Sequence, residues 1–201
     1  MSGAPIEFYF EFNSPYGYIA ACKLGDLAAK HGREVDWKPI LLRALFEVTG
    51  GRPLAQLPLR GDYMMHDFAR SAAYHGIAYR QPDVYPFPPV AAARAVYWAK
   101  DQDPAKAGEL GLALYHACSR DNVDIATPEG VAGIAANVGL DKDALLAALE
   151  TDAVKNRLAR EIEAALKKGV FGSPFIIVDG EGFWGADRLG MIDKWMQTGG
   201  W

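Results

Sequence analysis

The fold is decided by the stretch IEFYFEFNSPYGYIAACKLGDLAAKHGREVDWKPI, residues 6–40. Its first seven residues place an apolar side chain at every second position, which is the period of a β-strand. The helix predicted next begins with Ser14 and Pro15, which suit the N-cap and the first helical position, and it closes at Gly32. A second strand is predicted at 34–40. The order strand, helix, strand is typical of a βαβ unit.

Alternation within the first strand also predicts what covers it. A parallel strand that is buried on both faces is usually apolar throughout, whereas this one interrupts its apolar positions with Glu7 and Glu11. One face of the sheet is therefore predicted to meet a polar surface or a second domain.

The middle of the chain changes character. Residues 43–62 are rich in Gly, Pro and Leu, which predicts a long surface loop, and loops of that length are often functional. From 63 to 168 the pattern is helical almost throughout, and in 154–166 the apolar positions form one stripe. The segment 82–90 carries four prolines and breaks the helical array.

The chain ends with strand patterns again. FIIV (175–178), the turn DGEG and FWG (183–185) predict a β-hairpin, and 187–197 predicts a final helix with Asp187 at its start. Without the helical block, this order is the thioredoxin arrangement. The predicted fold class is therefore α/β, a thioredoxin-like domain with a large all-helical insertion. Its predicted boundaries are 1–42 and 151–201 for the thioredoxin-like domain and 43–150 for the loop and helical insertion.

Composition narrows the functional classes. Of 201 residues half are apolar, so one domain with an insertion can bury a substantial core. The net charge of -4 and scattered basic residues speak against a nucleic-acid partner. No basic leader precedes the first strand and no apolar run reaches the ~20 residues of a membrane helix, which predicts a cytoplasmic protein. Dispersed His, with Cys22 and Cys118 far apart, predict no metal site.

The strongest chemical signal is the helix start. Redox members of the thioredoxin fold place Cys-Pro-X-Cys there, where the helix N-terminus stabilises a thiolate. This chain has Ser14-Pro15-Tyr16-Gly17, and dithiol exchange needs two thiols, so the pattern excludes a dithiol oxidoreductase. A hydroxyl in the thiol's place predicts that the anion belongs to a bound ligand. The alternative is that Ser14 is an N-cap and nothing more.

Two further signals lie near the end of the chain. In GVFGSPFIIV (169–178) a proline directly precedes a strand, which predicts a cis Ser173–Pro174 bond and a Ser173 backbone that is free to pair with a cysteinyl peptide. In FWGADRL (183–189) a turn enters a helix, and its N–H groups are predicted to hold a carboxylate.

Together, NSPYGYIA, KGVFGSPFIIVDGEGFWGADRL and the helical insertion resemble the 2-hydroxychromene-2-carboxylate isomerases and their relatives, the kappa-class glutathione transferases. The resemblance covers nearly the whole chain. It implies a homodimer that binds glutathione. It also implies glutathione-dependent isomerisation of 2-hydroxychromene-2-carboxylate to trans-o-hydroxybenzylidenepyruvate, a step of aromatic hydrocarbon catabolism.

The resemblance also assigns roles to residues. The family serine matches Ser14, which it implies is catalytic and bonded to the glutathione sulfur. The family cis-proline matches Pro174, with Ser173 pairing with the cysteinyl unit. The site for the γ-glutamyl carboxylate matches Ala186 and Asp187, where the kappa-class members carry Ser at the first position. The family lysine that pairs with the glycine carboxylate of glutathione is matched by Arg60 in this chain. A family Asn near Gly51 is absent.

An aromatic pocket completes the predicted site. Tyr16, Tyr85, Phe87 and Trp184 are predicted to line it around a small aromatic carboxylate or another electrophilic substrate, although core packing is the common alternative for such side chains. The alternative for Asp187 is a role as a helix cap only, and the alternative for Arg60 is a solvated side chain that binds no carboxylate. Two other functions stay open: a kappa-like transferase that conjugates glutathione to electrophiles, and a non-catalytic glutathione- or peptide-binding module.

Overall fold

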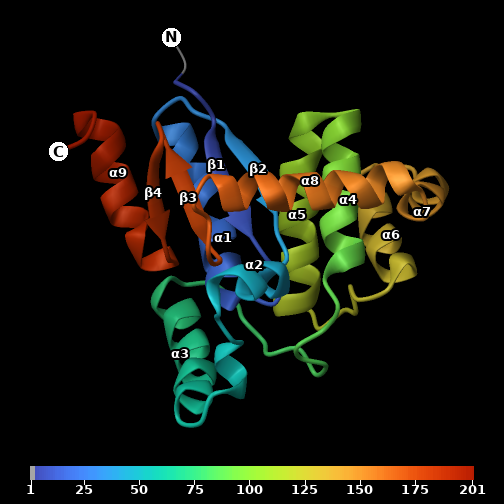
Figure 1. Ribbon diagram of the computed structural model, residues 1–201, viewed down its shortest axis with the longest axis horizontal. Coiled ribbons are helices and arrows are strands. Elements are labelled where there is room, and N and C mark those ends of the chain that lie inside the picture. The colour runs from blue at the N-terminus through green and yellow to red at the C-terminus, as the bar shows by residue number, and fades with distance from the viewer. Residues whose placement is uncertain (1–2) are drawn as a thin grey trace.

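A computed structural model describes residues 3–201, so residues 1 and 2 of the predicted 1–42 segment lie outside the described residues. A four-stranded mixed sheet forms the centre of the described chain (Figure 1). Its strands, in spatial order, are β2 (Val35–Pro39), β1 (Ile6–Phe10), β3 (Phe175–Val178) and β4 (Glu181–Trp184). β1 pairs in parallel with β2 and antiparallel with β3, and β3 and β4 form the predicted hairpin. This confirms the α/β class and the opening βαβ unit.

The two faces of β1 pack against different helices. Phe8 and Phe10 are fully buried in one core cluster with α1 (Pro15–Lys30), whereas Tyr9 belongs to a second cluster that contains residues of α8 (Asp152–Lys167). On this second face, the Lys168 ammonium donates to Glu7, and so does the Tyr9 hydroxyl. Because helices cover both faces, the interrupted apolar pattern reflects a polar edge on the α8 side.

The helices of the insertion from residue 90 onward form a bundle beside the β2 edge of the sheet (Figure 1). The helices of the insertion are α3 (Arg60–Tyr74), α4 (Val90–Gln102), α5 (Pro104–Ser119), α6 (Pro128–Asn137) and α7 (Lys142–Leu149). α5 approaches the sheet closely, since a Cβ at Gly108 or Gly111 would come within 2.8 or 2.9 Å of the Trp37 ring. In contrast, α3 extends from the body near the start of α1.

The segment 43–62, predicted as a long loop, contains two helical elements and the first turn of α3. The two elements are α2 (Leu42–Thr49) and the short 3₁₀ turn η1 (Leu54–Gln56). α2 is a short amphipathic helix that buries only Leu45, and Gly50 ends it in the left-handed region at φ 71°. The prediction rested on Gly and Pro residues, and these all lie after the C-terminal end of α2, in 50–61.

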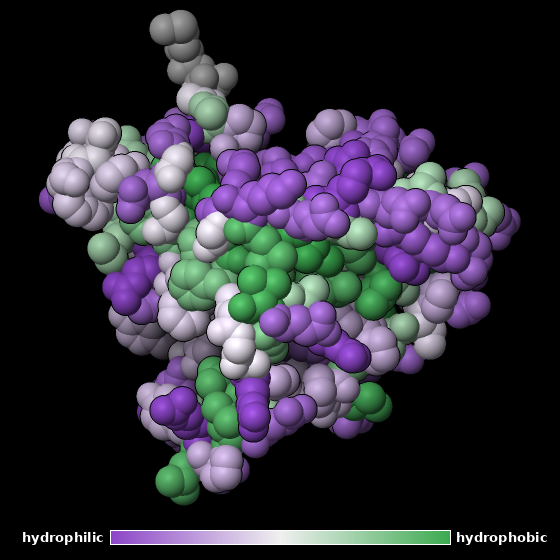
Figure 2. All heavy atoms as spheres, in the orientation of Figure 1, coloured by the Kyte–Doolittle hydropathy of each residue, from purple (hydrophilic) through white to green (hydrophobic). Residues whose placement is uncertain are grey.

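α8 confirms the predicted apolar stripe. Leu158 and Ile162 are buried beneath it, and Val154 and Leu166 pack against the core clusters as partly buried residues. The outward side of this helix is a hydrophilic band across the molecule (Figure 2). The described chain contains no helix that is long and apolar enough to cross a membrane.

The final helix begins two residues later than predicted. Asp187 lies in a 3₁₀ turn, η2 (Ala186–Arg188), and the final helix α9 (Leu189–Thr198) begins after it. Asp187 is therefore not the first residue of the final helix, and the N-cap position of α9 is Arg188. Gly185, at φ 108°, instead turns the chain sharply between β4 and η2.

Candidate active site

Ser14 lies between β1 and α1 and is buried, with 7% of its surface exposed. Its backbone is extended, and its Oγ accepts a hydrogen bond from the Gly17 N–H at 3.1 Å, so it is the N-cap of α1. The same Oγ lies 3.0 Å from the Ser173 carbonyl oxygen. A carbonyl only accepts, so the Ser14 hydroxyl donates to Ser173. Ser14 therefore bonds both to its own helix and to the loop before β3.

That loop connects the three predicted signals. The Ser173–Pro174 bond is cis, as predicted. The Ser173 Oγ accepts from the Glu11 backbone N–H at 2.9 Å, which fixes the loop to the end of β1. The Pro174 carbonyl accepts from the Gly185 N–H at 3.0 Å, which ties the loop to the turn before η2. The structure thus brings Ser14, the cis-proline and the Gly185 turn to one end of the sheet.

Gly17 stands where a Cys-Pro-X-Cys motif has its second cysteine. A Cβ built at Gly17 would overlap the Tyr115 hydroxyl and lie 3.1 Å from the Ser173 Oγ. Tyr115 is fully buried on α5, and its hydroxyl donates to the Glu11 carbonyl at 2.9 Å. The room that a second thiol needs is therefore filled by a hydrogen-bonded tyrosine, and any larger residue at this site must displace the Tyr115 hydroxyl.

Replacing Gly17 with alanine is expected to lower the free energy of unfolding by roughly 1–3 kcal/mol, because the new methyl group must displace the Tyr115 hydroxyl. Gly25, in the same helix, is the matched control, since a methyl group added there would meet no atom within 4 Å. Its alanine variant is expected to be more stable by roughly 0.5–1 kcal/mol. Urea unfolding of both variants measures the difference, and an equal effect at the two positions would contradict the crowding at Gly17.

Beneath Ser14 lies a buried acid that the sequence reasoning did not identify. The Glu11 carboxyl group accepts from the backbone N–H of Asn13 at 2.8 Å and from its side-chain amide at 3.1 Å. Burial raises the pKa of Glu11 to about 7, although the two hydrogen bonds from Asn13 oppose the rise. The signal was present in the sequence, since Glu11 places a charge at the end of a strand just before the motif.

Asn13 also connects this acid to the proline-rich segment. Its side chain accepts from the Phe87 N–H at 3.0 Å and donates to the Phe87 carbonyl at 2.9 Å. The Tyr85 hydroxyl donates to the Asn13 carbonyl at 2.9 Å, and Tyr85–Pro86 is a second cis bond. Phe87 is buried in the core, and Tyr85 is anchored by its hydroxyl. The structure therefore places these two aromatics behind the helix start, as supports of Asn13.

Tyr16 opens onto a hollow of about 330 Å³ between the start of α1 and α3. The lining residues are Tyr16, Leu54, Leu59, Arg60, Tyr63 and Met64. The walls are thus mostly apolar, and one guanidinium lies among them. No carboxylate of residues 3–201 forms an ion pair with Arg60. Apolar walls with one cation suit an apolar or aromatic carboxylate.

The Tyr16 hydroxyl itself is occupied. It donates to Asp67 of α3, which Arg70 also contacts. The bond from Tyr16 is the main cause that lowers the pKa of Asp67, while burial and this carboxylate raise the pKa of Tyr16. The ring packs edge-on against Phe68 at 4.7 Å. Tyr16 therefore offers its ring to the hollow, while its hydroxyl holds α3 against α1; no local pattern in the sequence pointed to Asp67.

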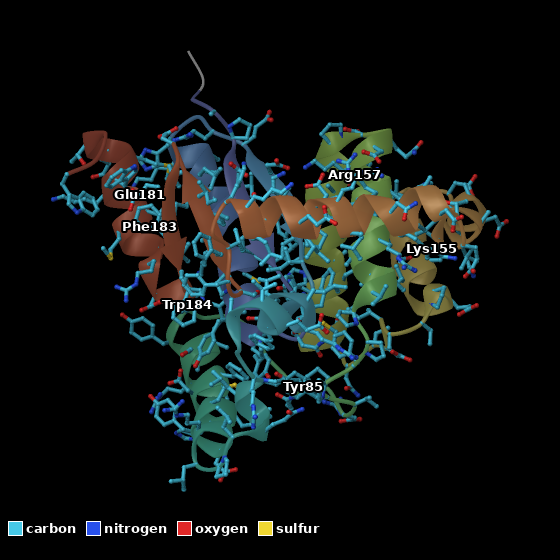
Figure 3. The ribbon with its side chains drawn as sticks, viewed as in Figure 1. Tyr85, Lys155, Arg157, Glu181, Phe183 and Trp184 are labelled. Carbon is cyan, nitrogen blue, oxygen red and sulfur yellow. The ribbon has the colours of Figure 1, made fainter. Side chains whose placement is uncertain are left out.

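Trp184 lies beside the loop that leads to the cis-proline. It is 56% exposed at the end of β4, and its ring packs against Phe171 with centroids 5.1 Å apart. A Cβ at Gly172 would come within 2.6 Å of the indole nitrogen, so the ring lies across the loop that leads to the cis-proline. Figure 3 shows Trp184 on β4 and Tyr85 on the segment before α4, so these two predicted pocket residues come from different parts of the chain.

The predicted carboxylate-binding turn follows Trp184. Ala186 is buried, while the side chain of Asp187 is 72% exposed and lies 3.5 Å from the guanidinium of Arg188. Because the Gly185 N–H is already bonded to Pro174, the groups left for a ligand are the backbone of η2 and the Asp187 carboxylate. The roles of Ala186 and Asp187 in binding stay predictions.

The cysteines lie away from this chemistry. Cys22 and Cys118 are free, and burial raises the pKa of both thiols, in Cys118 to about 11. Neither is a reactive thiolate at neutral pH. Residues 3–201 contain no cluster of three His, Cys, Asp or Glu side chains that could hold a metal ion.

Comparisons with known proteins agree with this geometry. The DsbA-like thioredoxin domain matches residues 5–197. The 2-hydroxychromene-2-carboxylate isomerase of Sphingobium xenophagum is 32% identical over 193 residues, which cover 95% of this chain and 97% of that protein. Glutathione s-transferase kappa 2 of Caenorhabditis elegans is 26% identical, over 93% of this chain and 89% of that protein. A solved structure of a 2-hydroxychromene-2-carboxylate isomerase superposes with a TM-score of 0.86 at 26% identity, over 96% of this chain and 94% of that chain.

Fold and site define a thioredoxin-fold protein in which a serine hydroxyl stands where redox members carry a thiol. The chain belongs to the DsbA-like thioredoxin family, in the branch of the 2-hydroxychromene-2-carboxylate isomerases and the kappa-class glutathione transferases.

Proposed function

We propose that the protein is a glutathione-dependent isomerase of the 2-hydroxychromene-2-carboxylate type. The observation that carries the proposal is Ser14 at the mouth of α1, hydrogen-bonded to the cis-proline loop, in a chain 32% identical to a named isomerase along its whole length. Bound glutathione supplies a thiolate that adds to the ring-opened substrate, so that a double bond can rotate, and leaves again afterwards.

The residues present fit glutathione. At the start of α1, Pro15 has no N–H and the Gly17 N–H is bonded to the Ser14 Oγ, so the Tyr16 N–H is the donor that remains. With the helix dipole, it favours an anion beside Ser14. In our proposal Ser14 bonds the sulfur, and the backbone of Ser173 holds the cysteinyl unit next to Pro174. Asp187 and the backbone of Ala186 hold the γ-glutamyl end.

The hollow at Tyr16 supports two assignments within this proposal. Arg60 binds a carboxylate at one end of it, which the family resemblance gives as the glycine carboxylate of glutathione. The ring of Tyr16 and the apolar walls formed by Leu54 and Met64 then contact the aromatic substrate. The exposed ring of Trp184 at the end of β4 is assigned as a further contact. Tyr85 and Phe87 support this site through Asn13.

One mixed assay distinguishes this function from its alternatives. Purified protein is incubated with 2-hydroxychromene-2-carboxylate and glutathione, and both the isomer and free glutathione are followed. Isomer formation at constant glutathione supports the isomerase. Consumption of glutathione together with an electrophile indicates the kappa-like transferase, which the relative from Caenorhabditis elegans makes the second candidate. Glutathione binding without either change indicates a non-catalytic binding module.

Glutathione is expected to stabilise the folded protein, since it binds the native state alone. At about a hundred times its dissociation constant, the gain in the free energy of unfolding is roughly 2.7 kcal/mol. Thermal unfolding measures this gain. S-methylglutathione, which keeps the peptide and loses the free thiol, is the matched control and should give a smaller shift. An unchanged melting temperature at high millimolar glutathione would contradict glutathione binding.

A homodimer and a cytoplasmic location complete the proposal. The family resemblance supports the homodimer, and sedimentation of the purified protein measures the oligomeric state. A monomer at micromolar concentration would contradict the dimer without affecting the assignment of Ser14.

A further inference from the structure

The Ser14 hydroxyl group has a single proton, and the structure shows where it points. It donates to the Ser173 carbonyl oxygen 3.0 Å away, while the Gly17 N–H occupies one acceptor position on the Ser14 Oγ. What this oxygen still offers to a ligand is its second lone pair. A lone pair accepts a hydrogen bond from a neutral thiol and repels a thiolate. In this arrangement Ser14 therefore favours the protonated thiol, which is the opposite of what the proposed reaction needs.

The Ser14 hydroxyl can give up its hydrogen bond to the Ser173 carbonyl if another donor pairs with that carbonyl. The carbonyl belongs to the residue before the cis-proline, whose position is fixed by the Glu11 N–H at the Ser173 Oγ and by the Gly185 N–H at the Pro174 carbonyl. Only the hydrogen on the Ser14 Oγ has to move. Rotation about the Cβ–Oγ bond redirects it without disturbing the hydrogen bond from Gly17.

We propose that Ser14 is a switched donor: a peptide N–H of the ligand pairs with the Ser173 carbonyl, displaces the Ser14 hydroxyl from it, and so turns that hydroxyl toward the ligand's sulfur. This inference rests on the proposed function. It assigns the Ser173 carbonyl a positioning role, and it restricts activation to one class of thiol. A thiol adjacent to an acylated N–H, as in a cysteinyl peptide, is activated, whereas a simple alkyl thiol is bound without activation.

The test compares two ligands that differ by one donor. One is glutathione, and the other is its ester analogue, in which an oxygen replaces the cysteinyl N–H and the thiol is kept. For each ligand at saturation, ultraviolet difference spectra follow thiolate formation against pH, with wild type and with Ser14→Ala. Ionisable groups around the junction, Glu11, Tyr85 and Tyr115, are the same in both measurements and cancel in the comparison.

With glutathione, Ser14→Ala is expected to raise the pKa of the bound thiol by about one to two units. With the ester analogue, wild type should already show the higher pKa, and Ser14→Ala should leave it unchanged or lower it, because the lone pair that opposes the thiolate is removed. The analogue should bind about 2- to 12-fold more weakly, as the loss of one neutral hydrogen bond implies.

If Ser14→Ala still raises the pKa of the bound thiol with the ester analogue, the switch is overturned while the proposed function stays intact. A loss of affinity far beyond 12-fold would also overturn it, because the N–H would then hold the ligand rather than direct Ser14. If glutathione itself does not bind to wild type, the proposed function fails as well, so the two failures are distinguishable.

Discussion

Replacing Ser14 with alanine is expected to slow the glutathione-dependent reaction at pH 7 by roughly 10- to 100-fold. A free cysteine-type thiol has a pKa of about 8.5, so only a few per cent is thiolate at neutral pH. A hydrogen bond to a charged partner is worth roughly 1.5–3 kcal/mol, which corresponds to one or two pKa units. Some activity should survive, because the N-terminus of α1 remains beside the sulfur.

The pH profile distinguishes this role from a structural one. The rate deficit of Ser14→Ala should shrink as the pH rises toward the altered pKa, because the variant then regains its thiolate. Thr127→Ala is the matched control, since the Thr127 Oγ1 caps α6 by accepting from the Gly130 N–H at 3.2 Å, with the same spacing as Ser14 and Gly17. It should lose a cap of roughly 0.5–2 kcal/mol and keep its rate. A folded Ser14→Ala variant with the wild-type rate at pH 7 would reduce Ser14 to a cap.

Stability is expected to fall as the pH rises from about 4.5 to 7, and Glu11→Gln should abolish most of that fall. Burial raises the pKa of Glu11 from 4.5 to about 7, so the folded state keeps a proton that the unfolded state has already released. Below pH 4.5 both states are protonated, and above pH 7 both are ionised. Between these limits wild type loses on the order of 3 kcal/mol of unfolding free energy through this group.

Glutamine reproduces the protonated form, because it is neutral and keeps one acceptor for the Asn13 N–H. The difference in unfolding free energy between Glu11→Gln and wild type should therefore move in favour of the variant by roughly 3 kcal/mol from pH 4.5 to pH 8. Urea unfolding across this range measures it, with the exposed Glu181→Gln as the surface control. A difference that does not change with pH would show that Glu11 stays charged when the protein is folded.

The local signals of the sequence were sufficient for the architecture and for part of the site. Strand periodicity, the Ser14 and Pro15 helix start and the β-hairpin are patterns within a few residues, so they predicted the thioredoxin arrangement and the cis Ser173–Pro174 bond. The same local view misjudged 43–62, where Gly and Pro concealed α2, and it placed Asp187 at a helix start that begins two residues later.

The motif at the helix start was enough to exclude dithiol chemistry, because residues 14–17 contain no cysteine. The residue that occupies the space of the second thiol could not be predicted from this motif. Tyr115 is about a hundred residues away on α5, and only the packing of that helix against α1 places its hydroxyl beside Gly17. In the same way, Asp67 meets Tyr16 only because α3 folds back over the start of α1.

What the sequence determined by itself is therefore the set of elements and the chemical identity of the residue at the mouth of α1: a serine, where a thiolate requires cysteine. What only the tertiary structure decided is the state of that serine. Its hydroxyl donates to the Ser173 carbonyl, 159 positions along the chain, and its surroundings include a buried acid at Glu11. The physical reason is that periodicity and capping act over a few residues, whereas hydrogen-bond direction and burial depend on which distant segments the fold brings together.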